Sequence, residues 1–181
     1  MAGLKPLVAQ QVTDKSAELF SSIERELGMV PNVFRTMAHS PKVFEAYMSF
    51  HDALREGVLS DTFRQRLALA VSEVNKCAYC LAEHSATALA AGLSEEEICD
   101  SRRAISPDRR LEAALSFARH VARGVQSVDD EGVSCLRRAG FDDREIAEII
   151  ATIVLTVVKN YFNKLAGTII DFPPTQDVYT W

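Results

Sequence analysis

Two cysteines and a histidine form the most reactive group of residues in the sequence. Cys77 and Cys80 lie three positions apart in the run Cys-Ala-Tyr-Cys, and His84 follows four positions later. If Cys77 opens a helix, this spacing places both sulfurs on one helical face, with His84 over the same face. Unpaired N–H groups at a helix N-terminus and a nearby imidazole both lower a thiol pKa. The group therefore supplies a nucleophilic thiolate, a resolving thiol and a base, which suit peroxide reduction or disulfide exchange.

Other interpretations of this pair must be weighed. Two buried, inert cysteines would show the same spacing, because free cysteine is among the most buried residue types. A structural zinc site needs four ligands, and the sequence offers no second Cys-x-x-Cys or histidine pair at suitable spacing. Thioredoxin-like use is disfavoured because no βαβ pattern surrounds the motif. We therefore expect redox-active thiols with no bound metal and no bound cofactor.

The elements that must position these residues all carry a helical pattern. Apolar residues recur with a helical period throughout, and no run shows sustained strand-like alternation. The expected helices begin near Asp14, Pro31, Pro41, Ser60, Cys77, Ser94, Pro107, Val128 and Asp142. Their expected ends include Gly28, Gly57, Ala91, Gly124, Ala139 and Ala166. The sequence predicts an all-α, single-domain bundle of about seven to nine helices, with the Cys-x-x-Cys pair at a helix N-terminus.

The 181 residues fit one domain that can bury its own core. We expect a motif-bearing core at about 41–125, a C-terminal helical part at about 126–168 and a tail at 169–181. The helix expected over 146–165 is apolar on most sides of its first three turns. Such a helix must be buried on several faces, so it lies either at the bundle centre or in a subunit interface.

Composition and charge exclude several classes of protein. The formal net charge of −5 and the absence of a Lys/Arg-rich cluster argue against nucleic-acid binding. Arg102-Arg103 is expected in a solvated loop. The longest uncharged apolar stretch, 149–158, is about half of the ~20 residues that span a bilayer. Without a secretory signal, the four cysteines indicate a cytoplasmic protein, and Cys99 and Cys135 are expected to be small core residues.

The run from Ser72 to Cys80, together with His84, resembles the core motif of the alkylhydroperoxidase D (AhpD)-like family. This family lies within the carboxymuconolactone decarboxylase-like superfamily. The segments 31–37 and 160–163 are similar to the flanks of its peroxidase-related branch, so the resemblance covers most of the chain. The Cys-x-x-Cys-x-x-x-His core is its most specific part.

The resemblance implies an all-α bundle that assembles as a homo-oligomer, as a dimer, trimer or hexamer, through the motif-bearing region. It implies that Cys80 attacks the peroxide and becomes a sulfenic acid, that Cys77 condenses with it to a disulfide, and that His84 belongs to a proton relay. It also implies an external thiol reductant, which is a lipoyl-bearing protein in the best-studied members. In those members electrons can also pass from the enzyme to a peroxiredoxin, so the resemblance implies such a partner as well.

Two positions depart from the family pattern. The relay of the family usually includes a glutamate twelve residues before the first cysteine, and Gln65 occupies that position here. Glutamine can hydrogen-bond His84 but cannot accept a proton. Either the relay is weaker, or Glu73 or Glu83 takes this role with a different geometry. Tyr79 also replaces a histidine that some members carry between the cysteines.

The leading hypothesis is a thiol-dependent peroxidase that acts on organic hydroperoxides or peroxide through a Cys77/Cys80 dithiol–disulfide cycle. Its expected catalytic residues are Cys80, Cys77, His84, Glu73 and Gln65. One alternative is an enzyme related to carboxymuconolactone decarboxylase, although that chemistry needs no adjacent dithiol. Another is a redox-sensing helical oligomer whose disulfide changes assembly without turnover.

Overall fold

The structure is a computed structural model that describes residues 3–12, 14–124 and 130–175. These residues form an all-helical domain with no β-strand among them, as the sequence predicts. The α-helices are α1 (Asp14–Leu27), α2 (Asn32–Met37), α3 (Pro41–Arg55), α4 (Asp61–Val74), α5 (Ala78–Ala90), α6 (Glu95–Arg103), α7 (Arg109–Arg123), α8 (Asp130–Arg138) and α9 (Asp143–Ala166). A short 3₁₀ helix, Ala9–Gln11, precedes them.

Side-chain caps explain why the helix starts could be located from the sequence. Ser60 accepts a hydrogen bond from the Phe63 N–H at the start of α4. Ser94 and Asp142 each form a complete capping box, at the starts of α6 and α9. The expected starts agree with the observed ones to within two residues, except that Val128 lies outside the described residues.

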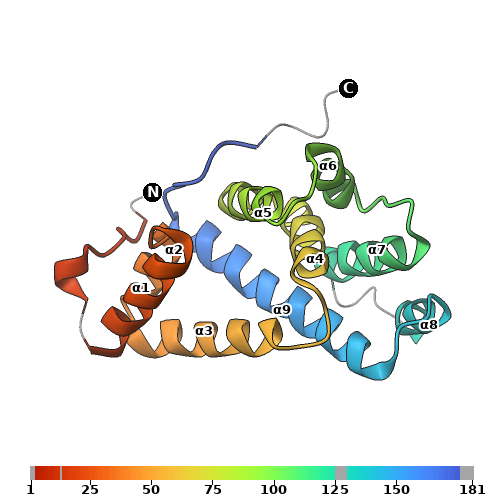
Figure 1. Ribbon diagram of the computed structural model, residues 1–181, viewed down its shortest axis with the longest axis horizontal. Helices are drawn as coiled ribbons and strands as arrows, with labels where there is room; N and C mark the ends of the chain where they lie inside the picture. The colour runs from red at the N-terminus through yellow and green to blue at the C-terminus, as the bar shows by residue number, and fades with distance from the viewer. Residues whose placement is uncertain (1–2, 13, 125–129, 176–181) are drawn as a thin grey trace.

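Helix α4 lies at the centre of the bundle and contacts α5, α6, α7 and α9 (Figure 1). Six consecutive residues from Leu67 to Ser72 are buried, so α4 meets neighbours around its whole circumference. One hydrophobic cluster joins α4, α7 and α9. A second cluster joins α1, α2 and α3 to the start of α5, and it contains both Cys77 and Cys80. The two thiols are therefore part of the packed core.

Helix α9 is apolar on two faces, and the described residues cover only one of them. Ile149 and Ile153 are buried against the α4–α7 side. On the other face a stripe of large hydrophobic residues is exposed, ending with Leu165 at 87% exposure. The stripe consists of Ile150, Val154, Val158, Tyr161 and Leu165. Helix α9 thus packs at the centre of the bundle on one face and presents a second apolar face that residues 3–12, 14–124 and 130–175 leave exposed.

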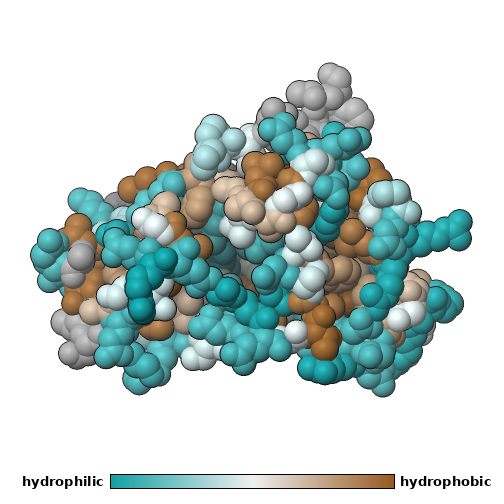
Figure 2. All heavy atoms as spheres, in the orientation of Figure 1, coloured by the Kyte–Doolittle hydropathy of each residue, from teal (hydrophilic) through white to brown (hydrophobic). Residues whose placement is uncertain are grey.

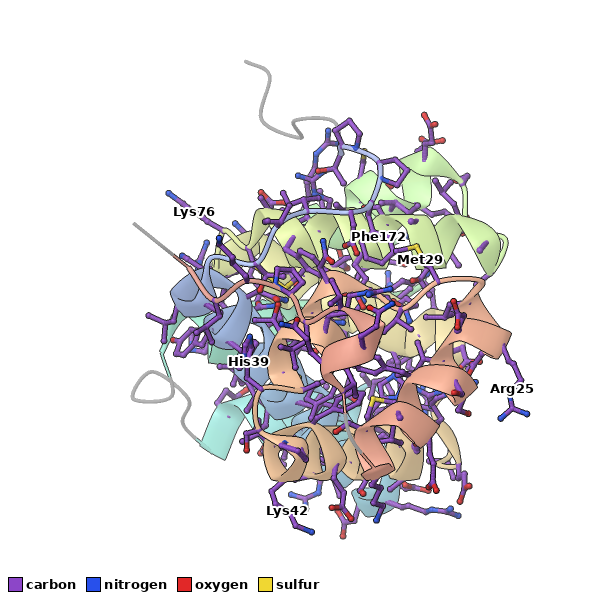
Figure 3. All side chains as sticks on the ribbon, turned by 90° about the vertical axis from the view of Figure 1, so that its left-hand side faces the viewer. Arg25, Met29, His39, Lys42, Lys76 and Phe172 are labelled. Carbon is purple, nitrogen blue, oxygen red and sulfur yellow. A yellow bond between two sulfur atoms is a disulfide. The ribbon has the colours of Figure 1, made fainter. Side chains whose placement is uncertain are left out.

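The connection between α4 and α5 is only three residues long and sets the position of Cys77. Asn75 caps α4, and Lys76 adopts a left-handed conformation with φ 49°. This conformation reverses the chain after a helix, so that the Cys77 N–H bonds the Ser72 carbonyl at 3.1 Å. The Lys76 side chain points away from the molecule (Figure 3). The tight turn carries Cys77 directly to the start of α5.

The C-terminal segment after α9 is tied to α5 and α2 through Tyr79. The Tyr79 hydroxyl donates to Asp171 Oδ1 at 2.8 Å and accepts from the Val33 N–H at 3.1 Å. Asp171 Oδ2 also accepts from the Asn32 N–H at 2.7 Å. Phe172, labelled in Figure 3, packs edge-on against the Tyr79 ring. Tyr79, which lies between the two cysteines, therefore anchors the C-terminal segment to α5 and α2.

Two expectations from the sequence are wrong. Arg102-Arg103 lies in α6 and not in a loop, and Arg102 is buried because Glu73 of α4 neutralises its charge. Cys135 is exposed on α8 and is not a core residue, whereas Cys99 is half-buried. In the described residues, no helix combines the length and apolar character that crossing a membrane requires.

Candidate active site

The two cysteines lie where α5 begins, as the sequence predicts. Cys77 is the N-cap residue, and its sulfur accepts a hydrogen bond from the Cys80 N–H at 3.4 Å. The sulfurs are joined as a disulfide, with the Cα atoms 5.3 Å apart. Cys80 is 0% exposed and Cys77 is 1% exposed. The unpaired amides of a helix N-terminus therefore lie beside Cys77, in a site that excludes water.

A second polar group reaches Cys80 from α9. Asn163 Nδ2 donates to Cys80 Sγ at 3.3 Å. An amide donor at this distance stabilises a thiolate on Cys80 after the disulfide is reduced. The sequence places Asn163 in the segment 160–163 that resembles a flank of the family, and it does not predict a role for this residue in the site. The signal that could have identified it is the group of polar residues that follows the apolar turns of this helix, Lys159, Asn160 and Asn163. All three are buried.

His84 and Gln65 are brought together, as the relay hypothesis requires. The His84 Nδ1 lies 2.7 Å from Gln65 Oε1. Because an amide oxygen only accepts hydrogen bonds, Nδ1 carries the proton and Nε2 has a free lone pair. Nε2 is buried and has no hydrogen-bond partner in the described part of the chain. Burial, and then the charges of Lys159 and His51, hold the pKa of His84 well below its ordinary value. His84 is thus a neutral base at neutral pH.

Replacing Gln65 with glutamate is expected to raise the pKa of His84, because a carboxylate on Nδ1–H stabilises the imidazolium. In the present protein the folded pKa of His84 lies below the unfolded value of about 6.5. The unfolded chain therefore binds the proton first, and stability falls as pH drops below about 6.5. Gln65→Glu should lose less stability over this range. The imidazole titration followed by NMR, with urea unfolding on both sides of this pH, checks both expectations.

Gln10→Glu is the matched control, because Gln10 is exposed on the 3₁₀ helix. It adds the same charge and should leave the His84 titration unchanged. An unaltered His84 pKa in Gln65→Glu would show that the contact between Gln65 and His84 does not control the basicity of the imidazole.

Glu83 forms a buried ion pair next to His84. Its Oε1 lies 2.5 Å from Lys159 Nζ of α9, and the two side chains are 11% and 5% exposed. The other carboxylate oxygen, Oε2, is buried without a hydrogen-bond partner in the described part of the chain. The pair places a carboxylate and an ammonium group beside the imidazole of α5. Lys159 was not foreseen as a site residue, since a lysine in a helix is usually exposed.

Glu73 is engaged elsewhere. Its Oε2 accepts a hydrogen bond from Arg102 Nε at 2.7 Å, which ties the end of α4 to α6. No described hydrogen bond joins Glu73 to Cys77 or Cys80. The structure thus joins Cys77 to Cys80 and His84 to Gln65, with Cys80 and His84 one turn apart on α5, whereas Glu73 forms an ion pair with Arg102. Among the described residues, no group of three or more His, Cys, Asp and Glu side chains is placed to hold a metal ion.

Residues 41–124 match the carboxymuconolactone decarboxylase family. The matched segment begins at α3, ends just after α7, and contains every residue of the predicted site. No curated protein matches the chain by sequence.

Solved structures share the fold over nearly the whole chain. An uncharacterized peroxidase-related protein from Silicibacter sp. TM1040 has a TM-score of 0.83 and 25% identity, covering 93% of this chain and 91% of the other. An alkylhydroperoxidase AhpD core protein from Ralstonia eutropha JMP134, also peroxidase-related and uncharacterized, has a TM-score of 0.81 and 26% identity. That comparison covers 99% of this chain and 95% of the other.

A more distant structure has the same fold and a different stated activity. It is a cysteine-to-alanine variant of the debrominase Bmp8 in complex with 2,3,4-tribromopyrrole. Its TM-score is 0.81 at 20% identity, with 93% of this chain and 91% of the other covered. At this identity the likeness extends to the fold alone.

Proposed function

Because the chain belongs to the AhpD-like and carboxymuconolactone decarboxylase-like superfamily, we propose that it is a thiol-dependent peroxidase. The observation that carries the proposal is the Cys77–Cys80 disulfide at the start of α5, one turn before a neutral imidazole with a free Nε2 lone pair. A dithiol with an adjacent base is the minimal equipment for two-electron reduction of an O–O bond.

In the proposed cycle, His84 Nε2 takes the proton of the Cys80 thiol. The thiolate attacks the outer oxygen of R–O–OH, so the O–O bond breaks, Cys80 becomes a sulfenic acid and the departing alkoxide receives the proton as ROH. The Cys77 thiol then displaces the hydroxyl of the sulfenic acid, which forms the disulfide and releases water. An external dithiol, such as a lipoyl group on a carrier protein, returns both sulfurs to the thiol form and is itself oxidised.

The test uses the full chain after reduction and removal of the reductant. One equivalent of an organic hydroperoxide should convert Cys77 and Cys80 to the disulfide and yield one equivalent of the alcohol, as measured by mass spectrometry. With a dihydrolipoyl compound in excess, peroxide consumption should become catalytic. Thiols that stay reduced under these conditions would exclude the peroxidase function.

Two alternatives are separated by other measurements. A redox sensor would change its oligomeric state between the reduced and oxidised forms. Light scattering with and without reductant measures the molecular mass of the assembly and detects such a change. The uncovered stripe of α9 supports assembly into a homo-oligomer in either case, because a large apolar surface favours burial against another chain. A decarboxylase-like enzyme would act on its substrate equally well with both cysteines replaced.

A further inference from the structure

A pocket of about 280 Å³ lies beside His84 and is lined by residues of α1, α2, α3, α4, α5 and α9. Figure 2 shows the surface recessed near the middle of the view, between α3 below and α5 above. The volume is close to the lower limit for pockets that bind small organic molecules, and it is roughly ten times the ~30 Å³ that one water occupies. The pocket therefore has room for one ring with a short substituent.

Four polar side chains of the pocket come from α5 and α9. Glu83, His84, Thr152 and Lys159 all line it. Glu83 Oε2, His84 Nε2 and Thr152 Oγ1 are buried atoms without hydrogen-bond partners in the described residues. Lys159 Nζ donates to Glu83 Oε1, and an ammonium group has three donors. These groups offer acceptors and a donor side by side, which suits a ligand group that both donates and accepts.

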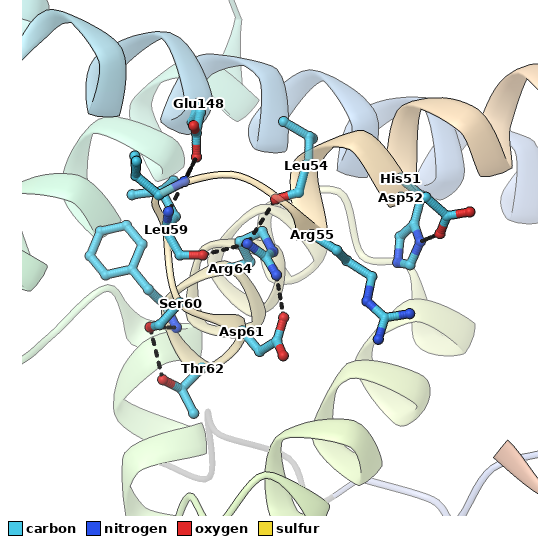
Figure 4. Close-up of polar contacts among 12 residues, drawn as sticks. His51, Asp52, Leu54, Arg55, Leu59, Ser60, Asp61, Thr62, Arg64 and Glu148 are labelled. Carbon is cyan, nitrogen blue, oxygen red and sulfur yellow. Dashed lines mark hydrogen bonds and ion pairs between the residues drawn. The ribbon is translucent and has the colours of Figure 1, made fainter. Parts of the chain in front are cut away.

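The charges at the rim of the pocket are already neutralised by neighbours. Arg64 bonds the Leu54 and Leu59 carbonyls and pairs with Asp61 (Figure 4). Arg55 pairs with Glu26 at 2.7 Å, and the lysine of the pocket is paired with Glu83. A charged ligand would have to break one of these pairs or enter without a counter-ion, which is costly in a buried site. The pocket is therefore suited to an uncharged molecule.

The remaining walls are apolar and lead towards the dithiol. They include Phe34, Tyr47, Met48, Leu54 and Leu155. Four of these five side chains, all except Leu54, also belong to the buried cluster that encloses Cys77 and Cys80, and Leu54 packs against that cluster. Aromatic rings and a thioether are favourable partners for the faces and edges of a bound ring. A molecule in this pocket would thus lie against the layer of side chains that covers the disulfide.

We propose that this pocket binds a compact, uncharged, ring-bearing molecule whose single O–H head lies at Glu83, Lys159 and His84. The O–H donates to Glu83 Oε2 or His84 Nε2, and its oxygen accepts from Lys159 Nζ. Phenols and arylalkyl hydroperoxides share this chemistry. The hydroperoxide case rests on the proposed function, because it makes the ligand the substrate, whereas the binding of a phenol does not depend on it.

Calorimetry of phenol binding to the reduced full chain tests the proposal directly. Phenol should bind saturably. Toluene lacks the hydroxyl head and benzoate brings a second carboxylate beside Glu83, so each should bind at least about tenfold more weakly. Absence of saturable binding at millimolar phenol, or equal affinity for toluene and phenol, would overturn the proposal.

Two tryptophan variants on α3 test the location. Leu54→Trp fills the pocket and should weaken phenol binding at least about tenfold. Val43→Trp is the matched control on the same helix, because Val43 is exposed and does not line the pocket. If circular dichroism shows that Leu54→Trp does not fold, Leu27→Trp at the exposed rim replaces it. Equal phenol affinity in the pocket variant and in Val43→Trp would overturn the assignment.

Competition separates this proposal from the proposed function. Phenol should slow oxidation of the dithiol by cumene hydroperoxide, whose ring competes for the pocket, more than oxidation by hydrogen peroxide. Equal slowing of both oxidants would overturn the hydroperoxide part of the proposal. If phenol binds as expected while neither peroxide oxidises the thiols, the proposed function fails and the binding site stands.

Discussion

Cys80→Ser is expected to abolish hydroperoxide reduction, with a loss of roughly 10³-fold or more, because removal of a nucleophile removes the covalent step itself. Cys80 is the cysteine that Asn163 Nδ2 contacts and that lies one helical turn before His84. Stopped-flow consumption of an organic hydroperoxide with excess dithiol measures the loss. Mass spectrometry should find Cys77 still reduced after exposure to peroxide.

Cys77→Ser should instead trap a sulfenic acid on Cys80, since the resolving thiol is missing. Cys99→Ser on α6 is the matched control and should turn over like the unaltered protein, because Cys99 is a free thiol outside the pair. Comparing Cys77→Ser with Cys80→Ser is informative because Cys77 is the N-cap residue of α5, where the helix amides can also stabilise a thiolate. A sulfenic acid on Cys77 in the Cys80→Ser variant would reverse the two roles.

Lys159→Met is expected to destabilise the fold by about 3–5 kcal/mol, because it leaves the buried Glu83 carboxylate without its counter-ion. Both partners of this pair are almost fully enclosed between α5 and α9. Urea unfolding followed by circular dichroism measures the difference in unfolding free energy between the variant and the unaltered protein. The comparison requires that the slope of unfolding free energy against urea concentration is the same in both.

The double variant Glu83→Gln with Lys159→Met should recover much of that loss, since no buried charge then remains unpaired. Lys42→Met is the surface control. Lys42 also pairs with a glutamate, Glu45, but its side chain is 90% exposed, so its removal should cost less than about 1 kcal/mol. Similar losses of unfolding free energy for Lys42→Met and Lys159→Met would show that burial does not make the Glu83–Lys159 pair more important for stability than an exposed pair.

Much of the fold could be predicted because its determinants are local. Caps such as Ser94 and Asp142 act on amides three residues away, and the left-handed turn at Gly167 ends α9 where the apolar period ends. The placement of Cys77 and Cys80 at the start of α5 follows from the same short-range rules. The contact between Gln65 and His84 was also foreseeable, through the resemblance of the motif to its family.

The rest depended on packing between helices that are distant in the chain. Lys159 and Asn163 contact α5 from a helix about eighty positions later in the chain. Arg102 of α6 pairs with the Glu73 carboxylate. No local pattern reports whether a long polar side chain will find a partner inside the core, because its burial depends on desolvation and on the opposite group together. The sequence by itself therefore determined the helices, their caps and the reactive dithiol. Only the tertiary structure decided which charges surround it and where a ligand can bind, because these depend on the packing of α3, α5 and α9 against one another.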